Sequence, residues 1–146
     1  MLILQNILSI MKFRVAIFKR RARRLVFDKF AFNGYRIGQD GTLYRGNKQC
    51  NTTDRRARMF YEINFMLEKK DRLGSPIYDH DIIFDARFSA LCTVIWSESN
   101  GAFAESHKQN GFKTTFRYCD FRTDAVEVIG NEYERCIRQI VAWCPK

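Results

Sequence analysis

One short stretch of the chain carries the side chains most often used in catalysis or metal binding. Asp79, His80 and Asp81 are consecutive, and Asp85 follows four residues later. Neighbouring side chains on a strand point to opposite faces, so at most two of these groups can converge on one ion or substrate. The only other histidine is His107, so no common zinc pattern can be assembled. We therefore expect no metal site here.

A second set of residues could supply a nucleophile and a base. Cys119 is followed by Asp120, and His107 precedes both, but nothing in their spacing brings them together. The glycine patterns that bind phosphates or dinucleotides are absent from the sequence. We expect no catalytic residue, no cofactor and no small-molecule substrate, and so a protein that is not an enzyme.

Two groups of cations are the stronger functional signal. Arginine dominates both, and its planar guanidinium matches the geometry of phosphate and carboxylate groups. The predicted binding residues are Lys19, Arg20, Arg21, Arg23, Arg24, Arg55, Arg56 and Arg58. Residues 1–60 hold 14 basic and 3 acidic side chains, whereas residues 61–146 hold 11 basic and 13 acidic ones. A basic half of this kind is typical of a chain that meets nucleic acid, an acidic protein or a membrane surface.

Several partners remain compatible with these cations. Phe18 and Phe27 flank the first group, but bases stack only on exposed rings, and these two alternate like core residues. The run of charges at 19–24 could also be a solvated hairpin tip without any partner.

The apolar start, MLILQNILSIM, is too short to span a bilayer, and its positive charges follow the apolar run, unlike those of a signal peptide. The five cysteines are odd in number and lack CxxC spacing, which favours a reducing, cytoplasmic compartment.

The elements that must position these side chains are mostly strands. Apolar and polar residues alternate over 12–18, and an apolar run resumes at 25–27, so the intervening charges are expected to connect two strands. Asp40-Gly41 predicts a tight turn between strands at 35–37 and 42–44. After a polar segment, Thr53 or Asp54 could cap a short helix, but 60–67 equally favours a strand.

The second half of the chain predicts a succession of short strands. Turn signals recur about every 10 residues, and strands are expected at 82–84, 90–97, 102–104, 114–118 and 125–129. This pattern is typical of a small antiparallel barrel or sandwich. Apolar residues from Tyr133 to Cys144 recur at helical spacing, which predicts one amphipathic C-terminal helix. The fold class is therefore mostly β, with a terminal helix.

Three segments resemble the YopX-like phage proteins, in the order in which that family has them. They are MKFRV followed by a basic stretch and LVFDKF, KKDRLGSPIYDHDII at 69–83, and VEVIGNEYE at 126–134. The segment TVIWSESNGAF at 93–103 also fits the hairpin of the family.

The family has Gly where this chain has His80, so this residue must accept a positive φ. The motif residues are expected to be structural: Gly74 and Pro76 shape a turn, Ile77 and Tyr78 fill the core, and Asp81 caps backbone amides.

The resemblance implies a prophage-encoded, cytoplasmic protein of a bacterial host, from a family without a defined reaction. Because the family-like start is Met11, residues 1–10 are expected to be an upstream extension, and translation from Met1 or Met11 stays open. Residues 11–60 are expected to form basic β-hairpins, and 61–146 a YopX-like barrel with the C-terminal helix. We expect an accessory protein that binds nucleic acid through its basic face. The alternative is an effector that binds an acidic surface of a host protein.

Overall fold

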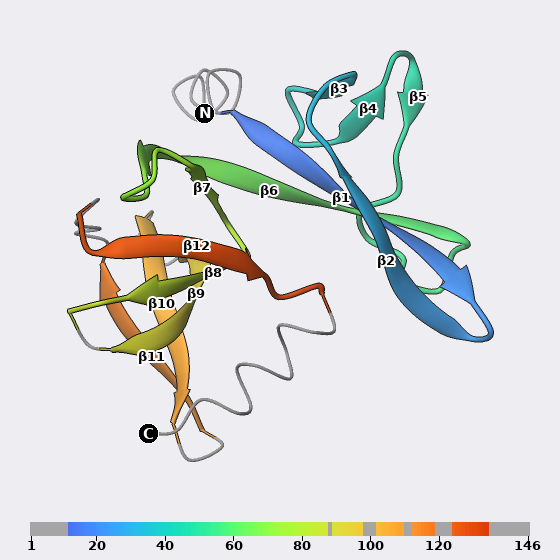
Figure 1. Cartoon of the computed structure of the whole chain (residues 1–146). Helices are drawn as coiled ribbons and strands as arrows, with labels where there is room; N and C mark the ends of the chain where they lie inside the picture. Colours follow the sequence, from blue (N-terminus) through green and yellow to red (C-terminus); the bar gives the residue numbers. More distant parts are fainter. Residues whose placement is uncertain (1–11, 88, 98–101, 110–111, 119–123, 135–146) are drawn as a thin grey trace. The chain divides into compact units, whose positions relative to one another are not determined.

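The computed structural model describes residues 12–87, 89–97, 102–109, 112–118 and 124–134, and every helix or strand within these ranges is a β-strand (Figure 1). Residues 1–11, on which the predicted extension falls, lie outside these ranges. The strands are β1 Phe13–Arg21, β2 Arg24–Ala31, β3 Tyr35–Ile37, β4 Leu43–Arg45, β5 Lys48–Gln49, β6 Met59–Lys70, β7 Pro76–Tyr78, β8 Asp81–Asp85, β9 Ala90–Ser97, β10 Ala102–Gln109, β11 Phe112–Tyr118 and β12 Val126–Asn131. The chain divides into two compact units, Met1–Met66 and Leu67–Lys146.

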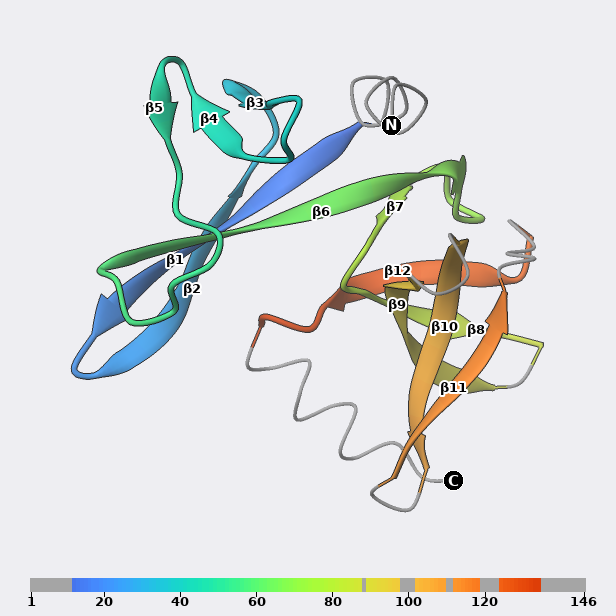
Figure 2. The same ribbon diagram turned by 180° about the vertical axis from the view of Figure 1, so that it is seen from behind.

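The first unit is built on a long antiparallel hairpin, β1 and β2, with β6 on the other side of β1 (Figures 1 and 2). The predicted connection at 19–24 is wrong in its length, because β1 continues through Arg21 and β2 begins at Arg24. Ala22 and Arg23 alone make the turn, with φ values of 48° and 67°. Two successive positive φ values match the right-handed twist of the flanking strands, so charged residues continue the ladder instead of interrupting it.

Residues 60–67, for which the sequence also allowed a strand, lie in a strand. β6 is 12 residues long, and Phe60 and Phe65 pair with Phe18 and Phe13 of β1. The short helix after Thr53 or Asp54 does not form. Instead, the Asn51 side chain accepts the amides of Thr53 and Asp54 and donates to two carbonyls, a local alternative to helical hydrogen bonds.

One face of the β1–β2–β6 sheet packs on the small sheet β3–β4–β5. Val15, Ile17, Leu43 and Cys50 are buried in this core, and each fully buried Val, Leu or Ile side chain contributes about 1.5–3 kcal/mol. The predicted hairpin turn at Asp40-Gly41 is confirmed, with Gly41 at φ 83° and the Asp40 carboxylate accepting the Thr42 amide.

The second unit contains an open five-stranded sheet in the order β11-β10-β9-β8-β12. The predicted barrel is therefore wrong in its closure: β11 and β12 lie at opposite ends of the sheet in the part of the chain that the structure describes. β7 does not extend this sheet, because it joins the sheet of β2, β1 and β6. The predicted C-terminal helix is not supported, since 135–146 lie outside the described residues and Asn131–Glu134 form a turn.

The family-like segments build the core of the second unit. Ile77 is fully buried with Ile83, Val94 and Val126, which confirms its predicted packing role. His80 adopts φ 69°, as its place in the motif requires, and the buried Asp81 accepts the Tyr78 amide at 2.8 Å. These residues hold the turn between β7 and β8.

Candidate nucleic-acid interface

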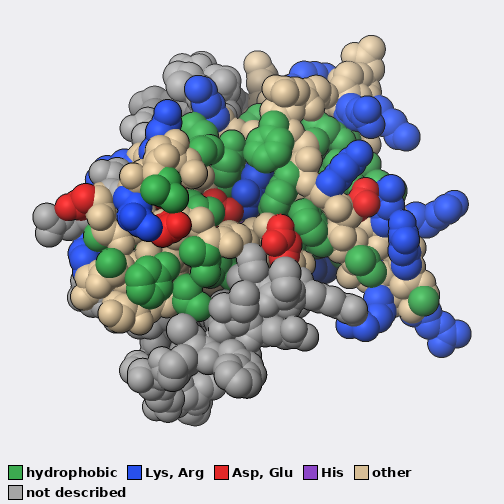
Figure 3. Space-filling view, in the orientation of Figure 1, with side chains coloured by type: hydrophobic (Ala, Val, Ile, Leu, Met, Phe, Trp, Pro, Cys, Tyr) green, Lys and Arg blue, Asp and Glu red, His purple; other side chains and the backbone are tan. Residues whose placement is uncertain are grey.

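The fold brings the two predicted groups of cations together at one end of the first unit. Lys19, Arg20, Arg21, Arg23 and Arg24 lie at the turn of the β1–β2 hairpin, and Arg55, Arg56 and Arg58 lie just before β6. β1 pairs with β6 so that Lys19 faces Met59, and the Arg20 amide donates to the Arg58 carbonyl at 2.9 Å. We call these eight residues the basic tip. Lys and Arg side chains project around this end of the first unit in Figure 3.

Arg20 has a structural role within the basic tip. Its guanidinium donates to the carbonyls of Ala57 and Arg23, each at 3.3 Å, and to the carbonyl of Arg55. It therefore ties the hairpin turn to the segment before β6. Because these donors already have partners, Arg20 positions the neighbouring arginines and is a weak candidate for phosphate contact itself.

Three further cations of the basic tip form exposed ion pairs. Lys19 pairs with Asp28 at 3.2 Å, Arg55 with Glu62 at 3.7 Å and Arg56 with Asp54 at 3.6 Å. Exposed pairs of this kind contribute only about 0–1 kcal/mol, so an incoming anion can compete for them. The Arg56 side chain in particular is 95% exposed.

The remaining four members of the basic tip lack any such partner. Arg21, Arg23, Arg24 and Arg58 are exposed, and none of their side chains makes an ion pair or hydrogen bond within the described part of the chain. Their like charges repel one another, and their guanidinium forks stay available to oxygen acceptors. Such a cluster is suited to the phosphates of a nucleic acid, which arginine binds in a bidentate manner.

A row of phenylalanine rings starts next to the basic tip and runs away from it along β2, and the sequence did not predict it. Ring-centroid distances are 5.8 Å for Phe60–Phe18, 5.7 Å for Phe18–Phe27, 4.9 Å for Phe27–Phe30 and 6.4 Å for Phe30–Phe32. Phe18 and Phe60 are buried, Phe27 and Phe30 are half-buried, and Phe32 is 57% exposed. We call these five residues the phenylalanine row.

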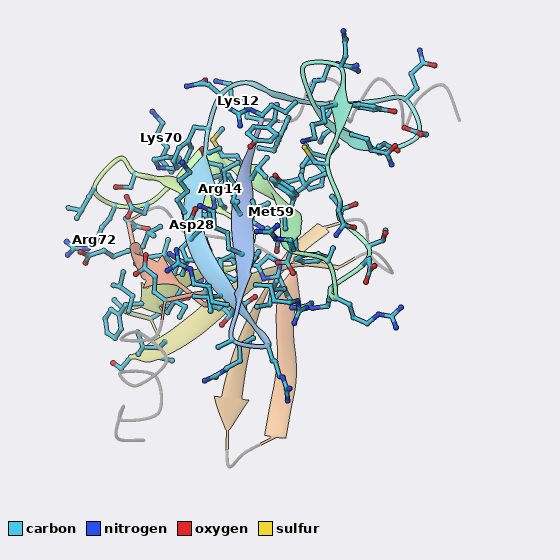
Figure 4. All side chains as sticks on the ribbon, turned by 90° about the vertical axis from the view of Figure 1, so that its right-hand side faces the viewer. Lys12, Arg14, Asp28, Met59, Lys70 and Arg72 are labelled. Carbon is cyan, nitrogen blue, oxygen red and sulfur yellow. The ribbon has the colours of Figure 1, made fainter. Side chains whose placement is uncertain are left out.

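A buried polar pair supports the middle of the phenylalanine row. Arg14 is 6% exposed, donates from Nε to Oδ1 of Asn64 at 3.1 Å, and places its guanidinium 3.8 Å from the centroid of Phe30. Figure 4 labels Arg14, which comes from β1, the strand between β2 and β6. A guanidinium on an aromatic face is held by cation–π attraction, so one face of Phe30 is already occupied.

The register explains why the sequence did not reveal this row. In regular alternation, Phe27 would share a face with residue 29, and Phe30 and Phe32 would lie on the opposite one. Phe18 pairs with Phe27 but Ile17 pairs with Lys29, so Asp28 is an extra residue in β2. This β-bulge moves Phe30 and Phe32 onto the face of Phe27, and no residue type in the sequence marks it.

The residues expected not to form a metal site are held by other protein groups. His80 contacts Glu132 through Nδ1, lies 3.4 Å from Asp79 through Nε2, and packs on the Tyr133 ring. Asp85 binds Arg87 at 2.7 Å. Within the described residues, no group of three or more His, Cys, Asp or Glu side chains could hold a metal ion. Cys119 and Asp120 lie outside those residues, and the side chain of His107 is not described.

A polar hollow of about 440 Å³ opens between the β3–β4 turn and residues 49–53. Hydrogen bonds from Thr42 lower the pKa of Asp40, whereas burial raises the pKa of the Cys50 thiol. Because a thiol with a raised pKa stays protonated near neutral pH, Cys50 is a poor nucleophile. Among the described residues that line the hollow, Cys50 therefore does not act as an activated thiol beside Asp40.

Comparisons with known proteins were made for the sequence as a whole. Residues 12–137 match a family model described as YopX protein. A search of curated proteins found no match. No helix in the described ranges has the length and apolar character needed to cross a membrane.

Proposed function

The chain belongs to the YopX family, and from that premise we propose that it is a non-enzymatic accessory protein of a phage or prophage that binds nucleic acid through the basic tip. The proposed phage association rests on the family membership alone. The bacterial cytoplasm is the proposed compartment, since nucleic acid is accessible there and the cysteine pattern favours it.

The observation that carries this proposal is the gathering at one end of the first unit of four arginines, Arg21, Arg23, Arg24 and Arg58, whose side chains have no partner among the described residues. Sequence-distant residues converge there because Arg20 joins the hairpin turn to the segment before β6. Unpaired like charges destabilise a fold, so their concentration at one place favours a role in binding an anion. A polyanion with regularly spaced phosphates fits several guanidinium groups at once.

The alternative partner is an acidic surface of a host protein. Val26 lies on β2 close to the same arginines and is 42% exposed, and Phe32, just beyond the far end of β2, is 57% exposed. Arginine together with exposed apolar side chains is also typical of protein–protein interfaces. Binding of this kind would need carboxylates opposite the basic tip, and would not respond to DNA or RNA.

Fluorescence anisotropy with labelled 12-nucleotide DNA and RNA, each single-stranded and duplex, tests the proposal. We expect binding at low salt by the wild type and a sharp loss in the triple variant Arg21→Gln/Arg23→Gln/Arg24→Gln. The matched control is Lys48→Gln/Lys69→Gln/Lys70→Gln, which removes three exposed charges outside the basic tip.

The result that would overturn the proposal is absence of DNA and RNA binding by the wild type at low salt. If the wild type then bound poly-L-glutamate and the triple variant did not, the host-protein alternative would be favoured. Equal loss in the triple and control variants would show that net charge acts without any defined site.

A further inference from the structure

Resting on the proposed function, we infer that the preferred ligand is a single strand, whose phosphates contact the basic tip while an unpaired base stacks on Phe32. The inference starts from the phenylalanine row, which the charge argument does not use. It names a second contact surface and the class of nucleic acid that this surface fits.

Phe32 is the ring that can receive a base. The row changes from buried at Phe60 and Phe18 to 57% exposed at Phe32, so its last ring presents apolar surface outward. The contact with Phe30 at 6.4 Å anchors this ring on half-buried neighbours. An anchored aromatic side chain loses little conformational freedom when a base stacks on it.

The cations and the ring lie along one strand. β2 begins at Arg24, and Phe32 is the residue just beyond its end, a span of about 26 Å at the rise of an extended strand. A nucleic acid strand that follows β2 from the hairpin turn therefore meets Arg23 and Arg24 first and the exposed ring afterwards. Arg14, stacked on Phe30, adds a positive charge beside the row.

An exposed ring on the path that leads away from phosphate-binding groups distinguishes single strands from duplexes. In a duplex the base faces are stacked on one another, so an aromatic side chain gains contact only by unstacking a step, which costs free energy. In a single strand each base offers a free face, and every base type can stack. The combination of basic tip and phenylalanine row thus favours single-stranded DNA or RNA.

The test compares three 12-nucleotide probes: oligo-dT, a duplex, and an abasic deoxyribose-phosphate strand that keeps the charges without bases. We expect the wild type to bind oligo-dT more tightly than the abasic strand. Phe32→Ala should weaken binding of oligo-dT roughly 5- to 150-fold, the range measured for removal of one stacking partner. Binding of the abasic strand and of the duplex should stay unchanged.

Two further variants separate stacking from apolar contact and from folding. Phe32→Trp keeps an aromatic face and should retain binding of oligo-dT. Val26→Ala removes an exposed apolar side chain from the same strand without removing a ring, and should have no effect. Thermal melting of each variant reports whether the first unit is intact.

The outcomes distinguish this inference from the proposed function. If oligo-dT and the abasic strand bind equally to the wild type, or if Phe32→Ala weakens all three probes alike, stacking on Phe32 is wrong. The arginine-dependent binding of DNA would then still stand. If the wild type binds none of the probes, both the inference and the proposed function fail.

Discussion

Arg20 differs from the other arginines of the basic tip in what its side chain binds. Three main-chain carbonyls accept hydrogen bonds from its guanidinium, whereas the side chain of Arg21 has no partner in the described part of the chain. Substitution of Arg20 therefore tests stability and substitution of Arg21 tests binding, although the sequence alone does not distinguish the two arginines.

We expect Arg20→Gln to lower the free energy of unfolding by about 1–2 kcal/mol, because hydrogen bonds from a charged donor are lost in a half-exposed setting. Arg21→Gln should stay within about 0.5 kcal/mol of the wild type. Urea denaturation of the two variants measures the difference. Equal stabilities would show that the contacts of Arg20 do not hold the hairpin turn to the segment before β6.

Asp71 plays a comparable organising part in the second unit. It is 4% exposed and accepts the amides of Leu73, Ser75 and Val128 at 3.0, 2.7 and 2.9 Å. One carboxylate thus fixes the turn at Gly74 and connects it to β12. This residue belongs to the family-like segment 69–83, where the sequence indicated a turn but not its acceptor.

We expect Asp71→Ala to destabilise the protein by about 2–5 kcal/mol, since several partly buried amides would lose their acceptor at once. Asp54→Ala is the control, because among the described residues the Asp54 carboxylate accepts one exposed amide and forms one exposed ion pair, both with Arg56. Chemical denaturation followed by tryptophan fluorescence gives both values. Losses of similar size in the two variants would contradict the role assigned to Asp71.

At the scale of elements, the sequence predicted what local residue patterns determine. Alternation and turn residues placed the β3–β4 hairpin, β9 and the turn at Gly74 correctly. The end of β1 and the face of Phe32 were not predictable, because both depend on pairing with another strand. The open sheet was missed for the same reason: which strand β7 joins is a tertiary choice that no residue in 76–78 encodes.

The turn between β1 and β2 can be tested separately from the rest of the fold. Ala22 has φ 48°, a conformation that costs an alanine roughly 1 kcal/mol and that asparagine tolerates better. We expect Ala22→Asn to stabilise the protein by about 0.5–1 kcal/mol while leaving every charge in place. Ala86→Asn, at an exposed alanine without positive φ, should give no gain. A loss of stability in Ala22→Asn, measured by thermal melting, would contradict the turn geometry.

At the scale of the whole molecule, charge is divided unevenly along the chain. Residues 1–60 carry a net +11 and residues 61–146 a net −2, so the excess belongs to the first unit almost entirely. The positions of the charged residues in the sequence predicted this division and the two groups of cations in the basic tip. It did not reveal that Arg20 is committed to the fold, nor that an aromatic row lies beside the arginines.

The central claim is that the basic tip binds phosphates, and the salt dependence of DNA binding measures it most directly. The logarithm of the association constant falls linearly with the logarithm of salt concentration, with a slope of about 0.7–0.9 for each phosphate neutralised. We expect Arg21→Gln/Arg23→Gln/Arg24→Gln to reduce this slope by roughly 2–3, and the Lys48→Gln/Lys69→Gln/Lys70→Gln control to leave it unchanged. A triple variant with the slope and affinity of the wild type at every salt concentration would contradict the claim.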